Sequence, residues 1–224
     1  MRQAVASWSG GKESCLACYR ALGQGYRVSH LLNVVWADVP RTMIHGLPQE
    51  VVAAQAAAIG IPLVQAPTTW ETYQEQFEKA LAGLRAEGVT MAVFGDIAND
   101  ENRAWDEKVC AAAGLEPLLP LWGMAPEEVL REFTAAGFEA LVVAVNGDLL
   151  DETWLGRPVN QQFIAELSQR EEGPPVNLCG ENGEYHTLVV DGPLFSCRLE
   201  ITDTAPVLRN GYWFLDVRSF RLSG

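Results

Sequence analysis

The feature that most constrains the fold is a regular alternation of apolar strands and amphipathic helices through the first half of the chain. Strands are expected at residues 3–7, 28–36, 62–66 and 90–95, followed by an extended segment at 116–122. Helices are expected at 13–22, 48–59, 70–87 and 100–113. Continuously apolar strands joined by helices are typical of parallel sheets that are buried on both faces. The sequence therefore predicts an α/β fold with an open five-stranded parallel sheet and helices on both faces.

The second half of the chain has a looser pattern. Helices are expected at 126–136 and 160–169, and strands at 139–145, 186–190, 198–201 and 212–217. The mixed order and the alternating character of the last strands predict a smaller α+β lobe. We therefore divide the chain into a first domain at 1–122 and a C-terminal lobe at 123–224.

A glycine loop lies between the first expected strand and the first expected helix. Gly10 and Gly11 can adopt backbone angles that direct their N–H groups at one oxyanion, and the helix start adds unpaired N–H donors. The Lys12 ammonium and the hydroxyl groups of Ser9 and Ser14 complete a set of donors suited to a pyrophosphate. The loop predicts a phosphate site.

Two better-known phosphate loops do not fit this stretch. A Walker A loop needs glycine at Ala6 and a serine or threonine at Glu13. A Rossmann fingerprint that starts at Gly11 needs glycine at Glu13 and Leu16. The alternative is an ordinary glycine turn before a helix, and the surrounding serine and lysine residues favour the phosphate site over that turn.

Charge and composition exclude several classes of protein. The chain has 29 acidic and 16 basic residues, a net charge of −13, and no cluster of lysine or arginine, which argues against a nucleic-acid partner. It has no apolar run of about 18 residues, and its first strand follows too closely on its start for a signal peptide. We expect a cytoplasmic protein with no membrane partner.

The cysteines leave one spacing to consider. Cys15 and Cys18 are three residues apart on the first expected helix, so a redox or metal pair is conceivable. The second pair that a zinc site needs is missing, and core packing is the favoured interpretation.

A second unusual stretch lies near residue 180. Residues 179–187 contain two glycines, two glutamates, a tyrosine, a histidine and a threonine. One interpretation is an acidic turn that leads into a strand. The other is the second half of an active site, in which Glu181 and Glu184 hold Mg²⁺ or bind an amine or ammonia.

Together, the two stretches resemble a known family. Residues 9–14 are similar to the S-G-G-K-D-S loop of the ATP pyrophosphatase superfamily, with Glu13 in place of aspartate. Residues 180–187 resemble the G-E-G-G-E-Y/F-E-T motif of the diphthine-ammonia ligase family, from which they depart at Asn182 and His186. Further matches run in order through the chain, at 43–45, 95–97, 107–110, 114–115, 120–123, 154–157 and 191–195.

The resemblance implies a fold and a reaction. Residues 1–122 would form a nucleotide-binding domain of the adenine nucleotide α-hydrolase type, and residues 123–224 a family-specific substrate lobe. The implied enzyme is an AMP-forming ligase that uses ATP and Mg²⁺ to adenylate a carboxylate, releases pyrophosphate, and then transfers ammonia or an amine. In eukaryotic and archaeal members the acceptor is diphthine on elongation factor 2, so the acceptor here could be carried on a protein.

The resemblance also implies roles for individual residues. The nucleotide-binding residues would be Ser9, Gly10, Gly11, Lys12, Ser14, His45, Gly95 and Asp96. Glu13 and Asp96 are the expected metal ligands. Lys12, Glu181 and Glu184 are the expected catalytic residues, with Tyr185 on the acceptor side and either His45 or Arg157 offsetting charge at the α phosphate.

Two other functions stay open. One is a regulatory protein of the same fold that binds ATP or AMP without ligase activity. The other is a tRNA-modifying pyrophosphatase, which would need basic extensions or zinc-binding cysteines that this sequence lacks. An apolar edge could also support a homodimer.

Overall fold

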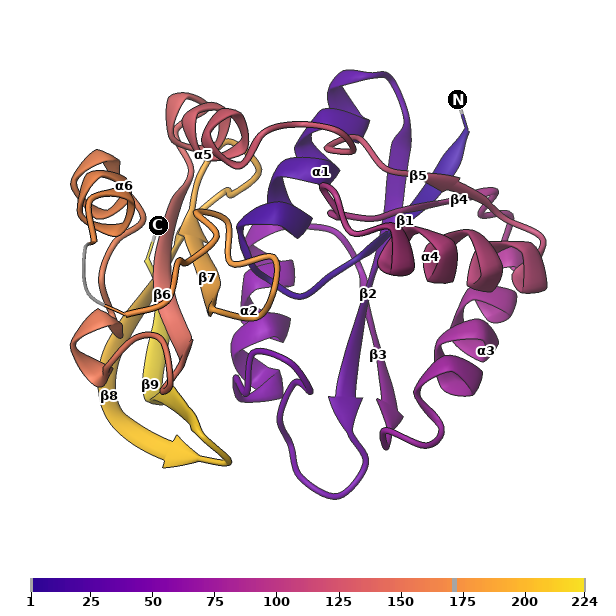
Figure 1. Ribbon diagram of the computed structural model, residues 1–224. Helices are drawn as coiled ribbons and strands as arrows, with labels where there is room; N and C mark the ends of the chain where they lie inside the picture. Colours follow the sequence, from indigo (N-terminus) through magenta and orange to yellow (C-terminus); the bar gives the residue numbers. More distant parts are fainter. Residues whose placement is uncertain (1, 171–172, 224) are drawn as a thin grey trace.

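The computed structural model describes residues 2–170 and 173–223, and Figure 1 shows its two lobes side by side. The N-terminal lobe contains a five-stranded parallel sheet with the strand order β3-β2-β1-β4-β5. Its strands are β1 (Gln3–Ser7), β2 (Arg27–Trp36), β3 (Leu63–Thr68), β4 (Met91–Val93) and β5 (Glu116–Leu118). Every paired neighbour in this sheet is parallel, as the alternation of strands and helices predicts.

Helices cover both faces of this sheet. They are α1 (Lys12–Gly23), α2 (Gln49–Ile59), α3 (Tyr73–Ala86) and α4 (Asp100–Ala113). Side chains alternate between the two faces of a strand. Accordingly, Ala4 and Ala6 of β1 pack into the core that contains α1 and α2, whereas Val5 packs into the core that contains α3 and α4. The predicted arrangement is confirmed.

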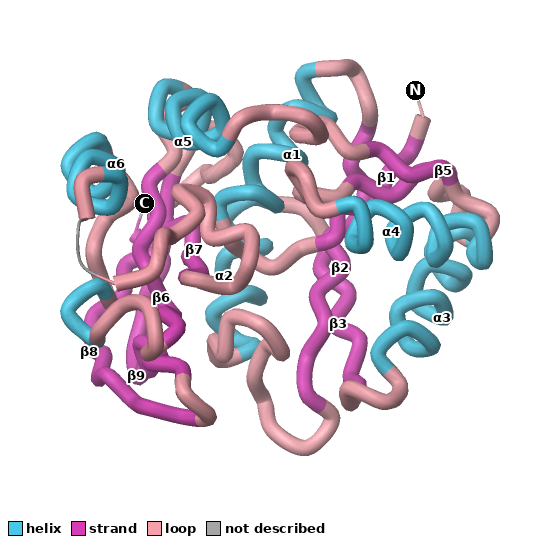
Figure 2. The backbone as a smooth tube through the Cα atoms, in the orientation of Figure 1, coloured by secondary structure: helices cyan, strands magenta, loops and turns pink. Residues whose placement is uncertain are grey.

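The C-terminal lobe contains a second sheet, which is antiparallel and has the strand order β7-β6-β9-β8. Its elements are α5 (Pro126–Ala135), β6 (Glu139–Asn146), the 3₁₀ turn η1 (Glu152–Trp154), α6 (Gln161–Ser168), β7 (Tyr185–Asp191), β8 (Arg198–Arg209) and β9 (Tyr212–Ser223). The α+β character of this lobe is confirmed. The tube in Figure 2 shows α1 and α2 between the two sheets, where α1 contacts β7 and α2 contacts β8 and β9.

The last two strands are much longer than the sequence analysis predicts. β8 and β9 form a hairpin of 12 residues on each side, joined by Asn210 and Gly211. Both residues have positive φ, 51° and 82°, as a two-residue hairpin turn requires. Asn-Gly is the strongest short-range hairpin signal, and from this turn the pairing runs past the polar residues near Asp203, where the register shifts. The third helix is shorter than predicted and starts at Tyr73, because the hydroxyl of Thr72 accepts from the Thr69 N–H in a turn before it.

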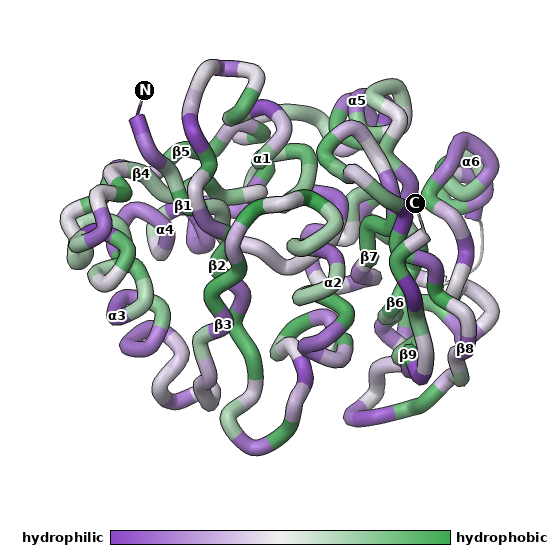
Figure 3. Tube along the Cα trace, turned by 180° about the vertical axis from the view of Figure 1, so that it is seen from behind, coloured by the Kyte–Doolittle hydropathy of each residue, from purple (hydrophilic) through white to green (hydrophobic). Residues whose placement is uncertain are grey.

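Apolar residues are concentrated in the interior strands of both sheets, as the hydropathy colouring of Figure 3 shows. Cys15 and Cys18 are fully buried in this core, which agrees with the packing interpretation of their spacing. Burial raises the pKa of the Cys18 thiol to about 12. Among the described residues, no helix is long and apolar enough to cross a membrane.

Candidate active site

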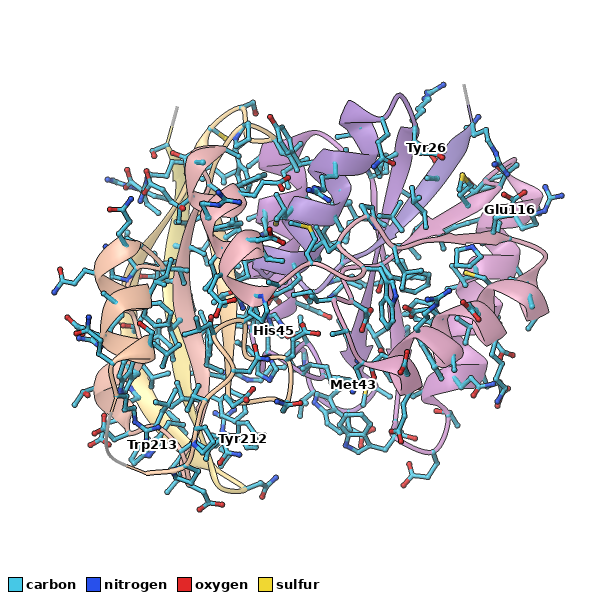
Figure 4. The ribbon with its side chains drawn as sticks, turned by 45° about the horizontal axis from the view of Figure 1, so that its top comes forward. Tyr26, Met43, His45, Glu116, Tyr212 and Trp213 are labelled. Atoms are coloured by element: carbon cyan, nitrogen blue, oxygen red, sulfur yellow. The ribbon has the colours of Figure 1, made fainter. Side chains whose placement is uncertain are left out.

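A cleft of about 460 Å³ opens between the two lobes. One wall is Ser9 with the start of α1, a second is the segment after β4, and a third is the stretch from Cys179 to Thr187, whereas Gly10 and Gly11 themselves do not line the cleft. The side chain of His45, labelled in Figure 4, lines this cleft where the two lobes meet. Ligands of open parallel sheets bind at the carboxyl ends of the strands, and this cleft occupies that position.

The glycine loop is shaped by contacts that leave no room for side chains. Gly10 has a φ of +83°, and its carbonyl accepts hydrogen bonds from the Gln55 side chain at 2.9 Å and from the Val189 N–H at 2.9 Å. A Cβ on Gly10 would lie 2.8 Å from Gln55, and one on Gly11 would lie 2.7 Å from the His45 ring. Both glycines are therefore required by close approach, and Gln55 of α2 holds the loop in place.

The serines of the loop form part of the same arrangement. The Ser9 hydroxyl accepts from the Gly11 N–H at 3.2 Å and lies 3.2 Å from the Ser14 hydroxyl. Ser14 donates to the Gly11 carbonyl at 3.0 Å, and both serines line the cleft. Their hydroxyls are thus placed beside the loop N–H groups, where a phosphate would need them.

Lys12 joins the glycine loop to the late stretch. Its Nζ donates to the Cys179 carbonyl at 2.7 Å, forms an ion pair with Glu13 at 2.6 Å, and lies 4.4 Å from the centre of the Tyr185 ring. Its backbone N–H donates to the Thr187 hydroxyl at 3.1 Å. Burial is the largest single effect and disfavours the ammonium, but Glu13, Tyr185 and Cys179 together outweigh it and raise the pKa of Lys12. The cleft therefore contains a positive charge at its inner end, although Lys12 is only 2% exposed.

Glu184 lies behind the cleft rather than in it. Its carboxylate accepts from the backbone N–H groups of Asn177 and Asn182, both at 2.9 Å, and from the Asn182 side chain at 3.1 Å. Although burial disfavours the charged form, these hydrogen bonds lower the pKa of Glu184. The structure does not bring Glu184 to the cleft, and its geometry is that of a residue that shapes the loop.

Glu181 does line the cleft, within a wall of carboxyl groups. Burial, followed by the charges of Glu13 and Asp96, raises the pKa of Glu181 to about 7. Asp96 accepts from the Asn102 side chain at 2.9 Å. Asp106 is 2% exposed, and its Oδ2 has no hydrogen-bond partner among the residues of the two described ranges. Burial and the neighbouring Asp96 raise the pKa of Asp106 to about 9.

Asn102 and Asp106 were not among the residues predicted from the sequence, although Asp96 was. The two residues are four positions apart on α4 and therefore lie on one face of the helix that follows the Asp96 loop. That spacing was the available signal. The carboxylates of Glu13, Asp96 and Glu181 are donors of the type that Mg²⁺ prefers, but within residues 2–170 and 173–223 no three such side chains are grouped closely enough to hold a metal ion by themselves. One or two carboxylates beside phosphate oxygens is the arrangement that Mg²⁺ usually takes, and these side chains could supply that number.

The two histidines of the cleft are stacked and neutral. The rings of His45 and His186 have centroids 4.8 Å apart and an interplanar angle of 28°. His45 Nδ1 lies 3.0 Å from the Thr187 carbonyl, so we assign the proton to Nδ1. Burial lowers the pKa of both imidazoles, that of His186 to about 4, and the Lys12 charge lowers them further. In this structure, neither ring carries a charge at neutral pH.

Of the other predicted residues, one is in place and one is not. Gly95 lines the cleft, and a Cβ there would lie 2.9 Å from the backbone of Glu13, so β4 and α1 touch at this point. Arg157 does not reach the cleft. It forms an ion pair with Glu166 at 2.5 Å and packs 4.4 Å from the Trp154 ring, so this geometry gives no support to a role at the α phosphate.

A family model described as the diphthamide synthase N-terminal domain matches residues 1–117, and one described as the diphthamide synthase C-terminal domain matches residues 125–221. The diphthine–ammonia ligase of Rattus norvegicus is 27% identical over 240 residues, which cover 96% of this chain and 89% of the relative. That of Homo sapiens is 26% identical over 237 residues, covering 95% and 88%.

A solved structure was also found. It is the predicted subunit of a tRNA methyltransferase from Methanocaldococcus jannaschii, with a TM-score of 0.47 and 13% sequence identity. The match covers 86% of this chain and 98% of that one.

Proposed function

The chain belongs to the diphthamide synthase family, and from this premise we propose that it is an ATP-dependent ligase that converts a carboxylate into an amide through an acyl adenylate. The observation that supports the proposal most directly is the position of Lys12. Its ammonium lies at the inner end of the cleft, where it pairs with Glu13 and donates to the Cys179 carbonyl of the late stretch. This one positive charge therefore lies where the proposed phosphate loop and the stretch from Cys179 to Thr187 meet.

In the proposed first step, the loop binds the β and γ phosphates of ATP. The N–H groups of Gly10 and Gly11, the hydroxyls of Ser9 and Ser14 and the Lys12 ammonium would stabilise the charge of the departing pyrophosphate. A carboxylate oxygen of the acceptor attacks the α phosphorus. The bond from that phosphorus to the bridging oxygen breaks, which gives an acyl adenylate and pyrophosphate.

In the second step, ammonia attacks the acyl carbon. The C–N bond forms, AMP leaves with the oxygen that joined it to the acyl group, and the nitrogen loses one proton. Glu181 lines the cleft, and its pKa of about 7 suits a group that accepts that proton near neutral pH. Glu184 acts in this proposal by holding the loop that carries Glu181.

Mg²⁺ is part of the proposal as the partner of the triphosphate. Glu13 and Asp96 would hold it together with the phosphate oxygens, since Mg²⁺ takes few protein carboxylates, and it would neutralise phosphate charge. His45 is proposed to contact the nucleotide as a neutral ring. The loop residues, Glu13, His45, Asp96 and Glu181 would thus touch the nucleotide, the acceptor or the metal, and Glu184 would position Glu181.

The test is calorimetric titration of ATP and Mg²⁺ into the protein and into Lys12→Met, which keeps the bulk of the buried side chain. The exposed Lys79→Met serves as the matched control. We expect ATP affinity to fall at least about tenfold in Lys12→Met alone, since a charge-assisted contact is worth about 1.5–3 kcal/mol. AMP and pyrophosphate are then assayed with candidate carboxylates and ammonium. Equal binding by all three proteins would refute the site, and ATP binding with no AMP from any acceptor would favour the regulatory protein instead.

Several broader predictions belong to the same proposal. The domain division at 1–122 and 123–224, a location in the cytoplasm, a protein-borne acceptor and a homodimer remain predictions. Size-exclusion chromatography with light scattering tests the dimer, and separate expression of the two segments tests the division.

A further inference from the structure

The carboxyl group of Asp106 is a buried polar group to which the proposed mechanism gives no role. Its side chain lines the cleft, yet the residue is only 2% exposed. Its Oδ2 has no hydrogen-bond partner in the part of the chain that the structure describes. A buried acceptor without a donor is costly, so folded proteins rarely contain one that no ligand, ion or water satisfies. The position of this oxygen therefore points to a small ligand that donates hydrogen bonds.

Aromatic side chains lie beside this carboxyl. Tyr73 is the first residue of α3, Trp105 lies on α4 and Phe94 follows β4, and all three line the cleft. The two helices pack side by side in Figure 1, and the Tyr73 and Trp105 rings have centroids 5.7 Å apart. Burial, followed by the charges of Asp106 and Asp96, raises the pKa of Tyr73 to about 12, so both carboxyls lie near its hydroxyl. We call Tyr73, Phe94, Trp105 and Asp106 the aromatic corner of the cleft.

The aromatic corner has negative charge around it and no cation of its own. Asp96 adjoins Asp106, and no lysine, arginine or histidine within residues 2–170 and 173–223 forms an ion pair with either carboxyl. The Lys12 ammonium of the same cleft is paired with Glu13 at 2.6 Å. A small cation in the corner would meet two carboxyl groups and aromatic rings, whose faces attract cations. Without such a cation Asp106 keeps a proton, because burial and the Asp96 charge raise its pKa.

The chemistry of the corner distinguishes between cations. Mg²⁺ needs oxygen ligands in octahedral geometry, which aromatic rings cannot provide, and the described ranges contain no three ligating side chains grouped closely enough to hold a metal ion. Alkali ions carry the charge but cannot donate a hydrogen bond to Oδ2. Ammonium has both the charge and the N–H donors. The burial of Oδ2 favours the unsubstituted ion over a bulky amine.

We propose that the aromatic corner binds ammonium, the nitrogen source of the amide-forming step. This inference rests on the proposed ligase function and adds the site of its second substrate. The corner and Glu181 line one cleft, and the Asp96 charge acts on both Glu181 and Asp106. The ion becomes a nucleophile when one N–H bond breaks and the proton passes to a carboxylate of the cleft, which leaves the electron pair on nitrogen.

The test follows thermal unfolding while ammonium chloride replaces sodium chloride at constant total salt, in EDTA at pH 8 and without nucleotide. A ligand that binds only the folded state raises the Tm until its site is saturated. For the wild type we expect a saturating rise of at least about 2 °C. Potassium chloride is the second titrant, and K⁺ should bind at least about threefold more weakly because it donates no hydrogen bond. Equal affinity for the two ions would overturn the assignment of ammonium.

Three variants locate the bound ion. Asp106→Asn should weaken ammonium binding at least about tenfold, since it removes a charge-assisted hydrogen bond, whereas the exposed Asp148→Asn should leave it unchanged. Trp105→Leu should weaken it about three- to tenfold.

A fourth variant, Trp105→Phe, keeps an aromatic ring and should retain most of the affinity. Each rise in Tm is measured against the same protein in sodium chloride, so differences in basal stability do not enter. A full rise in Asp106→Asn, or equal affinity in the two Trp105 variants, would overturn the inference.

Failure of the ammonium site and failure of the ligase can be told apart, because these titrations contain no nucleotide. If ATP binds in the calorimeter while ammonium gives no saturating rise, the ammonium inference is wrong and the nucleotide site stands. If ATP does not bind, the proposed function fails by itself. A cation in the corner would then supply no nitrogen to a ligase, and the inference would fall with that function.

Discussion

Replacing Asp106 by asparagine is expected to stabilise the folded protein at neutral pH. Asp106 is 2% exposed beside Asp96, and burial together with that neighbour raises its pKa from 3.8 to about 9. The folded protein therefore keeps a proton that the unfolded chain releases above about pH 4. An asparagine places a neutral side chain of almost the same shape against Asp96 and does not need that proton.

The magnitude follows from the pKa difference. The pKa of this carboxyl in the unfolded chain lies about three pH units below pH 7. Keeping the proton in the folded state at pH 7 therefore costs about 4 kcal/mol. Asp96 shares that cost, since its own pKa is raised by burial, so we expect Asp106→Asn to gain about half, or about 2 kcal/mol. For a chain of this length the gain raises the Tm by about 4–8 °C.

The pH dependence gives the sharper test. Because the folded-state pKa is the higher one, unfolding releases a proton between about pH 4 and pH 9, and the stability of the wild type falls as pH rises through that window. Thermal unfolding of both proteins is followed by circular dichroism at pH 5, 7 and 8.5, in EDTA, with exposed Asp148→Asn as the control. The advantage of Asp106→Asn should grow with pH. An advantage that is the same at all three pH values, or a loss of stability at pH 8.5, would refute the reasoning.

Three further substitutions test other parts of the site. Gly95→Ala puts a Cβ 2.9 Å from the backbone of Glu13, so we expect ATP affinity measured by calorimetry to fall at least about tenfold while the helix content stays unchanged. Retained affinity would contradict the close approach. Glu184→Gln should lower the free energy of unfolding, measured by urea denaturation, by about 1–3 kcal/mol, because an amide cannot accept all three hydrogen bonds. An unchanged free energy would count against the role of Glu184 in the loop. Gln55→Leu leaves the Gly10 carbonyl without one donor and should cost about 1–3 kcal/mol in the same assay, whereas a neutral result would mean that the loop holds itself.

The parallel sheet and its helices could be predicted because their signals are local. Residues 100–113 form α4 with the predicted bounds, since Asn99 caps its start with its side chain and Gly114 ends it in the left-handed conformation. Strand β2 has an apolar centre and lies between two neighbours, β1 and β3, as its pattern indicates. The length of β8 and β9 was missed because the strand prediction relied on apolar runs and gave no weight to the Asn-Gly turn.

The site could be predicted only where its residues are adjacent in sequence. Lys12 and the loop around it form a single stretch, and the structure places them at the carboxyl end of β1 as expected. The role of Gln55 depends on how α2 packs, and that of Asp106 on which face of α4 meets the cleft. Glu184 and Glu181 have the same residue type in the same motif, yet one holds the loop and the other faces the cleft. Only the turn geometry separates them.

The hydrogen bond from Lys12 to the Cys179 carbonyl has a consequence for how the protein is made. The two residues are 167 positions apart, so a chain emerging from the ribosome presents its glycine loop long before the segment that completes the cleft. Until then, the loop lacks the contacts of its Gly10 carbonyl with Val189 and of its Lys12 N–H with Thr187. A nucleotide would therefore encounter an ordered site only once synthesis has passed β7. Nascent chains stalled before and after that strand should differ in their ability to retain ATP.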